Sequence, residues 1–180
     1  MQFIQTELPG VVLINPKVWT DARGFFLESW NEEEFQRAGL DVRFRQDNHS
    51  RSNRNVLRGI HYQLRQPQGK LIRCTRGAIF DVVVDLRRSA KTFRRWVGVV
   101  LSEDNHQMLW VPPGFGHGFL VIGAEADVHY KASELYDAAS DRVVLWNDPQ
   151  LSIDWPLAGT PILSAKDAAA PLLDAAELFD

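Results

Sequence analysis

The sequence predicts an all-β fold, a sandwich or barrel with only a few short helices. Short apolar and aromatic runs follow one another along most of the chain, and turn signals rich in Gly, Pro and Asn separate them at short intervals. The run 79–86 is apolar apart from two aspartates, as in a strand that is buried on both faces. Helix signals are sparse by comparison, so we expect paired strands to carry the functional residues.

Length and composition fit one folded domain. The chain has 180 residues, enough to bury a substantial core but short for two unequal domains. Hydrophobic residues make up 45% of it and charged residues 24%, which is typical of a globular protein and argues against disorder. We therefore expect a single domain over residues 1–180.

Charge and cysteine content exclude several classes of protein. The 20 basic and 23 acidic residues give a net charge of -3, so no global field attracts nucleic acid or an anionic membrane, and local arginines must hold any anionic ligand. Cys74 is the only cysteine, which excludes an intramolecular disulfide and a cysteine-based zinc site. No signal peptide is visible, and no apolar run approaches the roughly 20 residues that span a bilayer. We expect a cytoplasmic protein.

Two strands and a turn are expected near the N-terminus. Residues 11–14 form an apolar run between turn signals that contain proline. Residues 21–24 have the composition of a turn, and the aromatic run 25–30 that follows favours a second strand.

Helix signals occur at three places. Asn31 can cap a short helix, Glu34 completes a capping box, and Gly39 can end the helix. Near the C-terminus, residues 164–167 have the spacing of a helix start, and residues 171–178 are expected to form a short terminal helix.

The strand 56–63 contains an arginine and a histidine in a β-favouring run. Strict alternation would place Arg58 and His61 on opposite faces, because they are three positions apart. A bulge or bend near Gly59 would bring both to one face, as glycine in strands often does. The alternative is an edge strand whose polar side chains are simply solvated.

Polar residues precede this strand. We expect residues 51–55 to form a loop, since they contain no apolar side chain. Just before them, Gln46 and Asn48 share a face if this segment is extended.

More strands are expected in the second half of the chain. The strand 70–75 places Lys70 on the same side as Ile72. Two prolines and three glycines in 112–118 rule out a regular helix and place His117 on a constrained loop. Further strands are expected at 78–86, 93–101, 107–111, 119–122 and 126–132.

Several stretches together resemble one family, the dTDP-4-dehydrorhamnose 3,5-epimerases, and they follow the family's order nearly from end to end. Each stretch alone is short, so their number and order carry the resemblance. The stretches are 21–28 (DARGFFLE), 46–50 (QDNHS), 57–63 (LRGIHYQ), 69–74 (GKLIRC), 84–87 (VDLR), 113–119 (PGFGHGF), 130–131 (YK), 146–149 (WNDP) and 164–167 (SAKD). The resemblance implies a cupin-type double-sheet jelly roll, a homodimer, and an isomerase that uses no cofactor or metal.

The implied substrate is a dTDP-linked 6-deoxy sugar with a ketone at C4, which acidifies the protons on C3 and C5. Removal of one proton gives an enolate, and the return of a proton on the opposite face inverts the carbon without redox chemistry.

The resemblance assigns catalysis to four residues. His61 would be the base, since an unperturbed imidazole titrates near neutral pH, and Asp167 would fix its tautomer. Tyr130 would be the acid on the opposite face of the sugar. Lys70 would lie near the sugar O4, where negative charge grows in the transition state.

The resemblance also implies a set of substrate contacts. Arg23 and Arg58 would bind the diphosphate and the sugar, a task that suits the planar guanidinium. Tyr136 would stack on the thymine base. The remaining implied contacts are Phe26, Glu28, Gln46, Asn48, His117, Asp141 and Lys166.

The chain departs from the family pattern at two positions. Asp141-Arg142 stands where a glutamate followed by a glycine is usual, and Gly116 stands where alanine is frequent. The shorter acid leaves open whether Asp141 contacts the nucleotide.

Three alternatives remain beside this interpretation. A metal-dependent cupin would bind iron or zinc through a carboxylate and histidines. The histidines available to it are His49, His61, His106 and His117, but the chain lacks the His-x-His pair of such cupins. A sugar-nucleotide-binding jelly roll without catalysis would not need both His61 and Tyr130. A sister epimerase that inverts one carbon is a closer rival, because one base and one acid serve both carbons.

Overall fold

The computed structural model describes all residues, 1–180, and contains eleven strands, two α-helices and one 3-10 helix. The strands are β1 (Gln2–Gln5), β2 (Val12–Asn15), β3 (Val18–Asp21), β4 (Gly24–Leu27), β5 (Gln46–Asn53), β6 (Leu57–Gln63), β7 (Lys70–Asp85), β8 (Trp96–Ser102), β9 (Met108–Val111), β10 (Phe115–Ala132) and β11 (Asp141–Val143). The helices are α1 (Glu32–Arg37), α2 (Ala165–Ala168) and the 3-10 helix η1 (Leu173–Ala175). The predicted all-β fold is confirmed. None of the helices has the length and hydrophobicity needed to cross a membrane.

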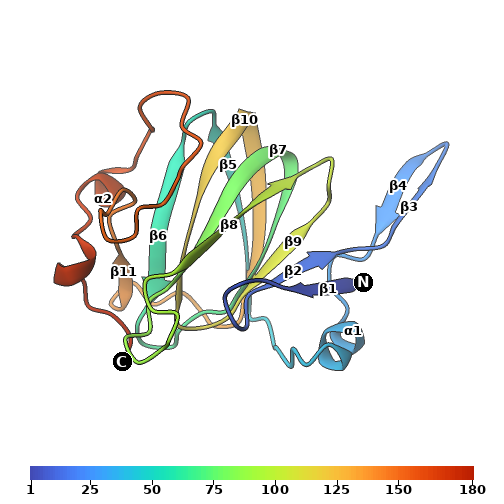
Figure 1. Ribbon diagram of the computed structural model, residues 1–180. Coiled ribbons are helices and arrows are strands. Elements are labelled where there is room, and N and C mark those ends of the chain that lie inside the picture. Colours follow the sequence, from blue (N-terminus) through green and yellow to red (C-terminus); the bar gives the residue numbers. More distant parts are fainter.

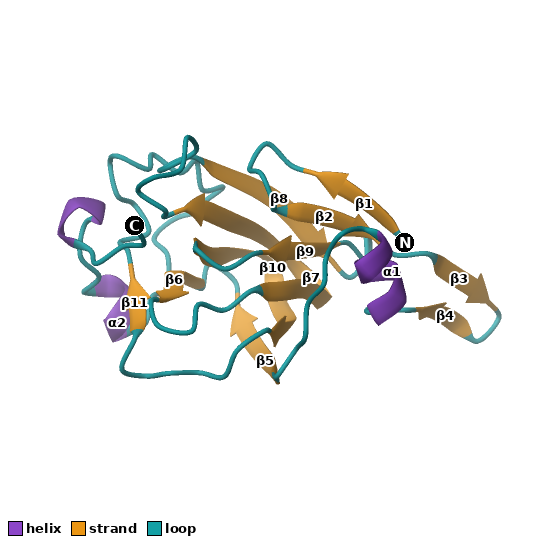
Figure 2. Cartoon of the chain, turned by 90° about the horizontal axis from the view of Figure 1, so that it is seen from below, coloured by secondary structure: helices purple, strands orange, loops and turns teal.

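One antiparallel sheet of nine strands forms the body of the protein. Its central order is β1-β2-β9-β7-β10-β6-β11, with β8 paired to β7 and β5 paired to β10. The sheet curls so that its strands surround an interior (Figures 1 and 2). β3 and β4 form a separate hairpin that projects from this body beside α1 (Figure 1).

The longest strands, β7 and β10, lie at the centre of the sheet. They pair from Lys70 opposite Ala132 to Asp85 opposite Phe115, and the register shifts in the middle of this ladder. β6 pairs with β10 on one side of this shift, and β5 pairs with β10 on the other side. Because such irregularities bend a strand pair, both strands arch, and their halves contribute to different walls of the body (Figure 1).

Apolar side chains pack on both faces of β7, as the sequence predicts for 79–86. Val83 lies in an interior cluster with Phe119, whereas Val82 and Val84 pack on the other face against Trp155 of the C-terminal segment. A third cluster joins α1 to β2 and β9 through Phe35, Ile14, Met108 and Trp110.

The loop predicted at 51–55 is wrong in its first half, because β5 continues to Asn53. Ser52 is buried, while Arg51 points the other way and donates two hydrogen bonds of 2.7 Å to Asp127 of β10. Pairing with a distant strand therefore overrides the polar composition of this segment.

The predicted loop around His117 is also wrong, because β10 begins at Phe115 and contains this histidine. The glycines of this segment allow close strand contact instead of turns. A side chain at Gly118 would approach the carbonyl oxygen of Arg58 to 2.7 Å, so glycine is required for β6 to lie beside β10.

The helix starts are confirmed at both predicted positions. The side chain of Asn31 accepts a hydrogen bond from the Glu34 amide at 3.2 Å, as a helix cap does. The capping box is only half formed, because the Glu34 carboxylate binds the N-terminal amino group of Met1 at 2.7 Å. Ser164 caps α2. The helix predicted at 171–178 is reduced to the short helix η1.

The predicted bulge near Gly59 is confirmed by the register of β6 against β10. His61 lies opposite His117 and Arg58 lies opposite Phe119, so three steps along β6 match two along β10. The Gly59–Ile60 peptide bond within this bulge is cis. The extra residue places Arg58 and His61 on the same face, which is the face of His117 and Phe119.

We predict that Gly59→Ala destabilises the fold by about 2–4 kcal/mol. Its φ is +129°, and a Cβ atom would lie 2.5 Å from the Cα atom of Gly118 and 2.9 Å from the His117 carbonyl oxygen. Gly159→Ala is the matched control, since Gly159 has a φ of +120° but no atom within 4 Å of the added carbon. Urea unfolding measures both variants, and equal losses would contradict the role of the Gly59 contact.

Candidate active site

His61 and Asp167 form a pair between β6 and α2. The His61 Nε2 atom lies 2.5 Å from the Asp167 Oδ1 atom, and Asp167 is 2% exposed. Ser164, the cap of α2, donates to the other carboxylate oxygen at 2.8 Å. Burial acts to raise the pKa of Asp167, but the hydrogen bond and charge of His61 outweigh it and leave this pKa lowered. A carboxylate that holds one ring nitrogen leaves the other able to accept a proton.

A second histidine–aspartate pair lies on the same face of the sheet. The His117 Nε2 atom is 3.0 Å and 2.9 Å from the two carboxylate oxygens of Asp81, and both residues are buried. Asp81 is an aspartate of the apolar run 79–86, to which the sequence interpretation gave no role. The signal for this pair was an aspartate in a run predicted to be buried on both faces. A fully buried carboxylate needs a partner with positive charge or hydrogen-bond donors.

Lys70 and Tyr130 are linked electrostatically to residues on other strands. Burial lowers the pKa of Lys70 to about 8, while the carboxylates of Asp141 and Asp81 act in the opposite direction. Burial raises the pKa of Tyr130, against which the Arg58 guanidinium acts. Lys70 and Asp81 come from β7, Tyr130 from β10, Arg58 from β6 and Asp141 from β11. Because these groups act on one another's pKa values, we place their side chains in one interior that the sheet encloses.

Arg58 projects toward β5 from the bulge of β6. Its Nε atom donates to the Ser52 hydroxyl at 3.1 Å, and its terminal nitrogens make no hydrogen bond within the protein. The guanidinium thus keeps its paired donors for an anionic ligand.

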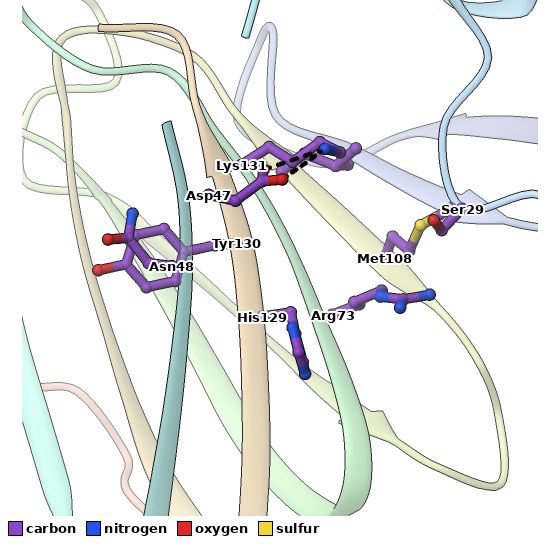
Figure 3. Close-up of a pocket in the computed structure, with 9 residues that line it drawn as sticks. Ser29, Asp47, Asn48, Arg73, Met108, His129, Tyr130 and Lys131 are labelled. Atoms are coloured by element: carbon purple, nitrogen blue, oxygen red, sulfur yellow. Dashed lines mark hydrogen bonds and ion pairs between the residues drawn. The ribbon is translucent and has the colours of Figure 1, made fainter. Parts of the chain in front are cut away.

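Tyr130 and Asn48 lie opposite one another on β10 and β5 and share a face. Figure 3 shows their side chains together on one side of these strands, with the ion pair of Asp47 and Lys131 on the other side. A cavity of about 160 Å³ adjoins this region. It is lined by Ser29, Asp47, Asn48, Leu71, Arg73, Met108, His129, Tyr130 and Lys131. His61, Lys70 and Asp167 do not line it, whereas Tyr130 does.

Five predicted substrate contacts are joined by hydrogen bonds at the end of the interior. The Gln46 side chain donates to Asn48 at 2.9 Å and accepts from the backbone amide of Tyr136 at 2.9 Å. The Tyr136 hydroxyl donates to an oxygen of Asp141 at 2.9 Å, and Lys166 binds the same oxygen at 2.5 Å. The structure thus brings these five residues together.

Three predicted contacts lie on or beside the projecting hairpin and do not reach this group. The Arg23 side chain is 90% exposed and binds Asp21 at 2.6 Å. Phe26 is 66% exposed, and Glu28 accepts a hydrogen bond from Asn31. The hairpin points away from β6 and α2 in both views (Figures 1 and 2).

The histidines of the metal-dependent alternative do not converge. His49 stacks on His129 with ring centroids 3.9 Å apart, and His106 packs on Phe25 of the hairpin. No group of three His, Cys, Asp or Glu side chains is placed to hold a metal ion.

Comparison with known proteins decides the family. The family described as dTDP-4-dehydrorhamnose 3,5-epimerase matches residues 5–175. The chain belongs to this family. A relative of the same name from Salmonella typhimurium is 51% identical over 182 residues, which covers 100% of each chain. Another, from Pseudomonas aeruginosa, is 49% identical over 99% of each chain.

Solved structures of the family have the same fold. The epimerase RmlC of Legionella pneumophila, in complex with dTDP-4-keto-L-rhamnose, is 47% identical with a TM-score of 0.95, over 97% of this chain and 93% of that one. ChmJ of Streptomyces bikiniensis, a 3'-monoepimerase in complex with dTDP-quinovose, is 36% identical with a TM-score of 0.89, over 94% of this chain and 86% of that one. The predicted cupin-type jelly roll is confirmed.

We predict that the Lys70 amino group titrates with a midpoint near pH 8, compared with about 10.4 for an exposed lysine. NMR of the reductively methylated protein measures this midpoint directly. Asp141→Asn should lower it further, because the Asp141 charge favours the protonated amine. A midpoint near that of exposed lysines, or one that rises in Asp141→Asn, would contradict this assignment.

Proposed function

We propose that this protein catalyses the cofactor-free 3,5-epimerisation of dTDP-4-dehydro-6-deoxy-D-glucose to dTDP-4-dehydro-L-rhamnose, a step of dTDP-L-rhamnose biosynthesis. The observation that carries the proposal is the His61–Asp167 pair, which faces the interior where Lys70 and Tyr130 also act. The named activity of relatives about half identical over the whole chain supports it.

The first half of the reaction removes a proton. His61 takes it from the carbon next to the C4 ketone, and the electron pair of the broken C–H bond moves onto the ketone oxygen. Asp167 stabilises the imidazolium that forms, because it is buried and hydrogen-bonded to the ring. Lys70, charged below about pH 8, stabilises the enolate oxygen.

The second half returns a proton to the opposite face. Tyr130 donates its hydroxyl proton to the carbon, the enolate becomes the ketone again, and the carbon is inverted. Exchange with water restores the proton of Tyr130 and removes that of His61. The same cycle at the second carbon completes the double epimerisation.

Recognition falls to groups around this interior. The free terminal nitrogens of Arg58 bind the anionic part of the substrate, and His117 contacts the sugar. Asn48, Tyr136 and Lys166 hold the nucleotide end.

We predict that the protein exchanges the C3 and C5 hydrogens of the substrate for deuterium in heavy water, as followed by NMR. His61→Ala should lose about 100- to 10,000-fold in exchange rate, because general base catalysis contributes about 10²–10⁴-fold. Its affinity for dTDP should stay close to that of the wild type, since His61 contacts the sugar and not the nucleotide.

The outcomes of this experiment separate the alternatives. Exchange at neither carbon would overturn the proposed function, and exchange at one carbon would select a one-carbon epimerase. Comparable exchange in His61→Ala would show that another group is the base. Stoichiometric iron or zinc in the purified protein would favour the metal-dependent cupin.

We also propose that the protein forms a homodimer in which the β3–β4 hairpin of each copy reaches the site of the other. This would reconcile the predicted roles of Arg23, Phe26 and Glu28 with their distance from their own interior. Large apolar side chains support it, since Phe25 is 61% and Phe26 is 66% exposed. A cytoplasmic location stays a prediction.

Complementation tests the shared site. We predict that Arg23→Ala and His61→Ala are each poorly active alone, whereas co-refolded mixtures recover about a quarter of the wild-type rate, since half of the dimers then contain one intact site. A co-refolded mixture no more active than either variant alone would contradict the proposal that the hairpin of each copy completes the site of the other.

A further inference from the structure

Tyr136 is an exposed aromatic side chain that is nevertheless held at two points. It is 59% exposed, yet its hydroxyl donates to Asp141 at 2.9 Å and its backbone amide donates to Gln46 at 2.9 Å. Exposed tyrosines usually lose rotamer entropy when ordered, so two anchors on one such residue indicate that its orientation matters.

Gln46 has both of its functional groups engaged. Its oxygen accepts from the Tyr136 amide, and its nitrogen donates to the Asn48 oxygen. The Asn48 amide nitrogen has no partner within the protein and remains the free donor of this pair. Gln46 therefore orients its neighbours more than it offers a contact of its own.

Asp141 is engaged in the same way from the opposite side. One of its oxygens accepts from both the Tyr136 hydroxyl and the Lys166 ammonium, and its side chain is only 19% exposed. An aspartate side chain is one carbon shorter than that of the glutamate usual in the family. Here it extends only as far as Tyr136 and Lys166. Its other oxygen, Oδ1, makes no hydrogen bond within the protein, so the positioning role falls to Oδ2.

We propose that Asp141 is a positioning residue for Tyr136. Together with Gln46, it clamps the Tyr136 ring as a preformed platform on which the base of the nucleotide stacks. A platform held before binding costs less ordering entropy when the ligand arrives, which raises affinity without a new contact. This inference rests on the proposed function, because it takes dTDP as the ligand.

The test is a double-mutant cycle on dTDP affinity, measured by isothermal titration calorimetry. In the wild-type background, Tyr136→Phe removes the hydroxyl anchor but keeps the ring, and should weaken dTDP binding about fivefold. In the Asp141→Ala background the anchor is already lost, so the same change should have no effect. In Asp141→Asn, whose amide oxygen can still accept from the hydroxyl, most of the hydroxyl's effect should remain. Asp154→Ala, which removes an exposed carboxylate with no hydrogen-bond partner, is the control and should bind as the wild type does.

The dependence of the deuterium-exchange rate on substrate concentration gives a second readout, because it separates KM from kcat. The clamp acts on binding, so KM should rise in Tyr136→Phe while kcat stays within about twofold. An equal effect of Tyr136→Phe in both backgrounds, or none in the wild type, would overturn the clamp. If the wild-type protein still exchanges the substrate hydrogens when the cycle fails in this way, only the clamp is overturned and the proposed function is retained. A wild-type protein that neither exchanges hydrogens nor binds dTDP would overturn both.

Discussion

The contact between two glycines on neighbouring strands sets the geometry on which the site depends. Gly59 of β6 lies so close to Gly118 of β10 that a Cβ atom would come within 2.5 Å of the partner's Cα atom. The bulge at this contact adds one residue to β6 and turns Arg58 and His61 to the same face. A regular strand would have sent one of them to the apolar outer face, where an unpaired charge is costly.

The interior that this face lines contains ionisable groups that are paired before any ligand binds. Asp167 and Asp81 are each almost fully buried, and each is bound by one imidazole. Removal of the His117 imidazole would leave the buried carboxylate of Asp81 without a partner, a change that typically costs about 3–5 kcal/mol, whereas Asp167 would keep the hydroxyl of Ser164. The stability of the fold therefore depends on these imidazole–carboxylate pairs. The same pairing gives each ring a defined tautomer. The contacts that stabilise the fold here are thus the same ones that orient the two histidines.

Local signals predicted much of this arrangement, and long-range pairing accounts for what they missed. Strand runs, the Asn31 cap and the bulge at Gly59 all follow from residues near one another in the chain. The extension of β5 depends on Asp127, 76 positions from Arg51, and the buried pair of Asp81 joins residues 36 positions apart. No local pattern specifies such partners. The family resemblance supplied the roles of the site residues, which composition and periodicity alone left open.

Charge explains why the projecting hairpin matters for recognition. A nucleotide diphosphate carries more than one negative charge, and the protein's net charge of -3 provides no general attraction. Within one chain, Lys166 is already neutralised by Asp141, and Lys70 is assigned to the enolate oxygen. Arg58 is then the cation near the interior whose free donors can bind the diphosphate. One guanidinium is a weak match for a diphosphate. In the proposed dimer the hairpin of the second copy adds Arg23, whose only partner is the exposed Asp21 on the same turn. Exchange of that weak surface pair for a diphosphate costs little, so assembly of the dimer and binding of the substrate favour one another.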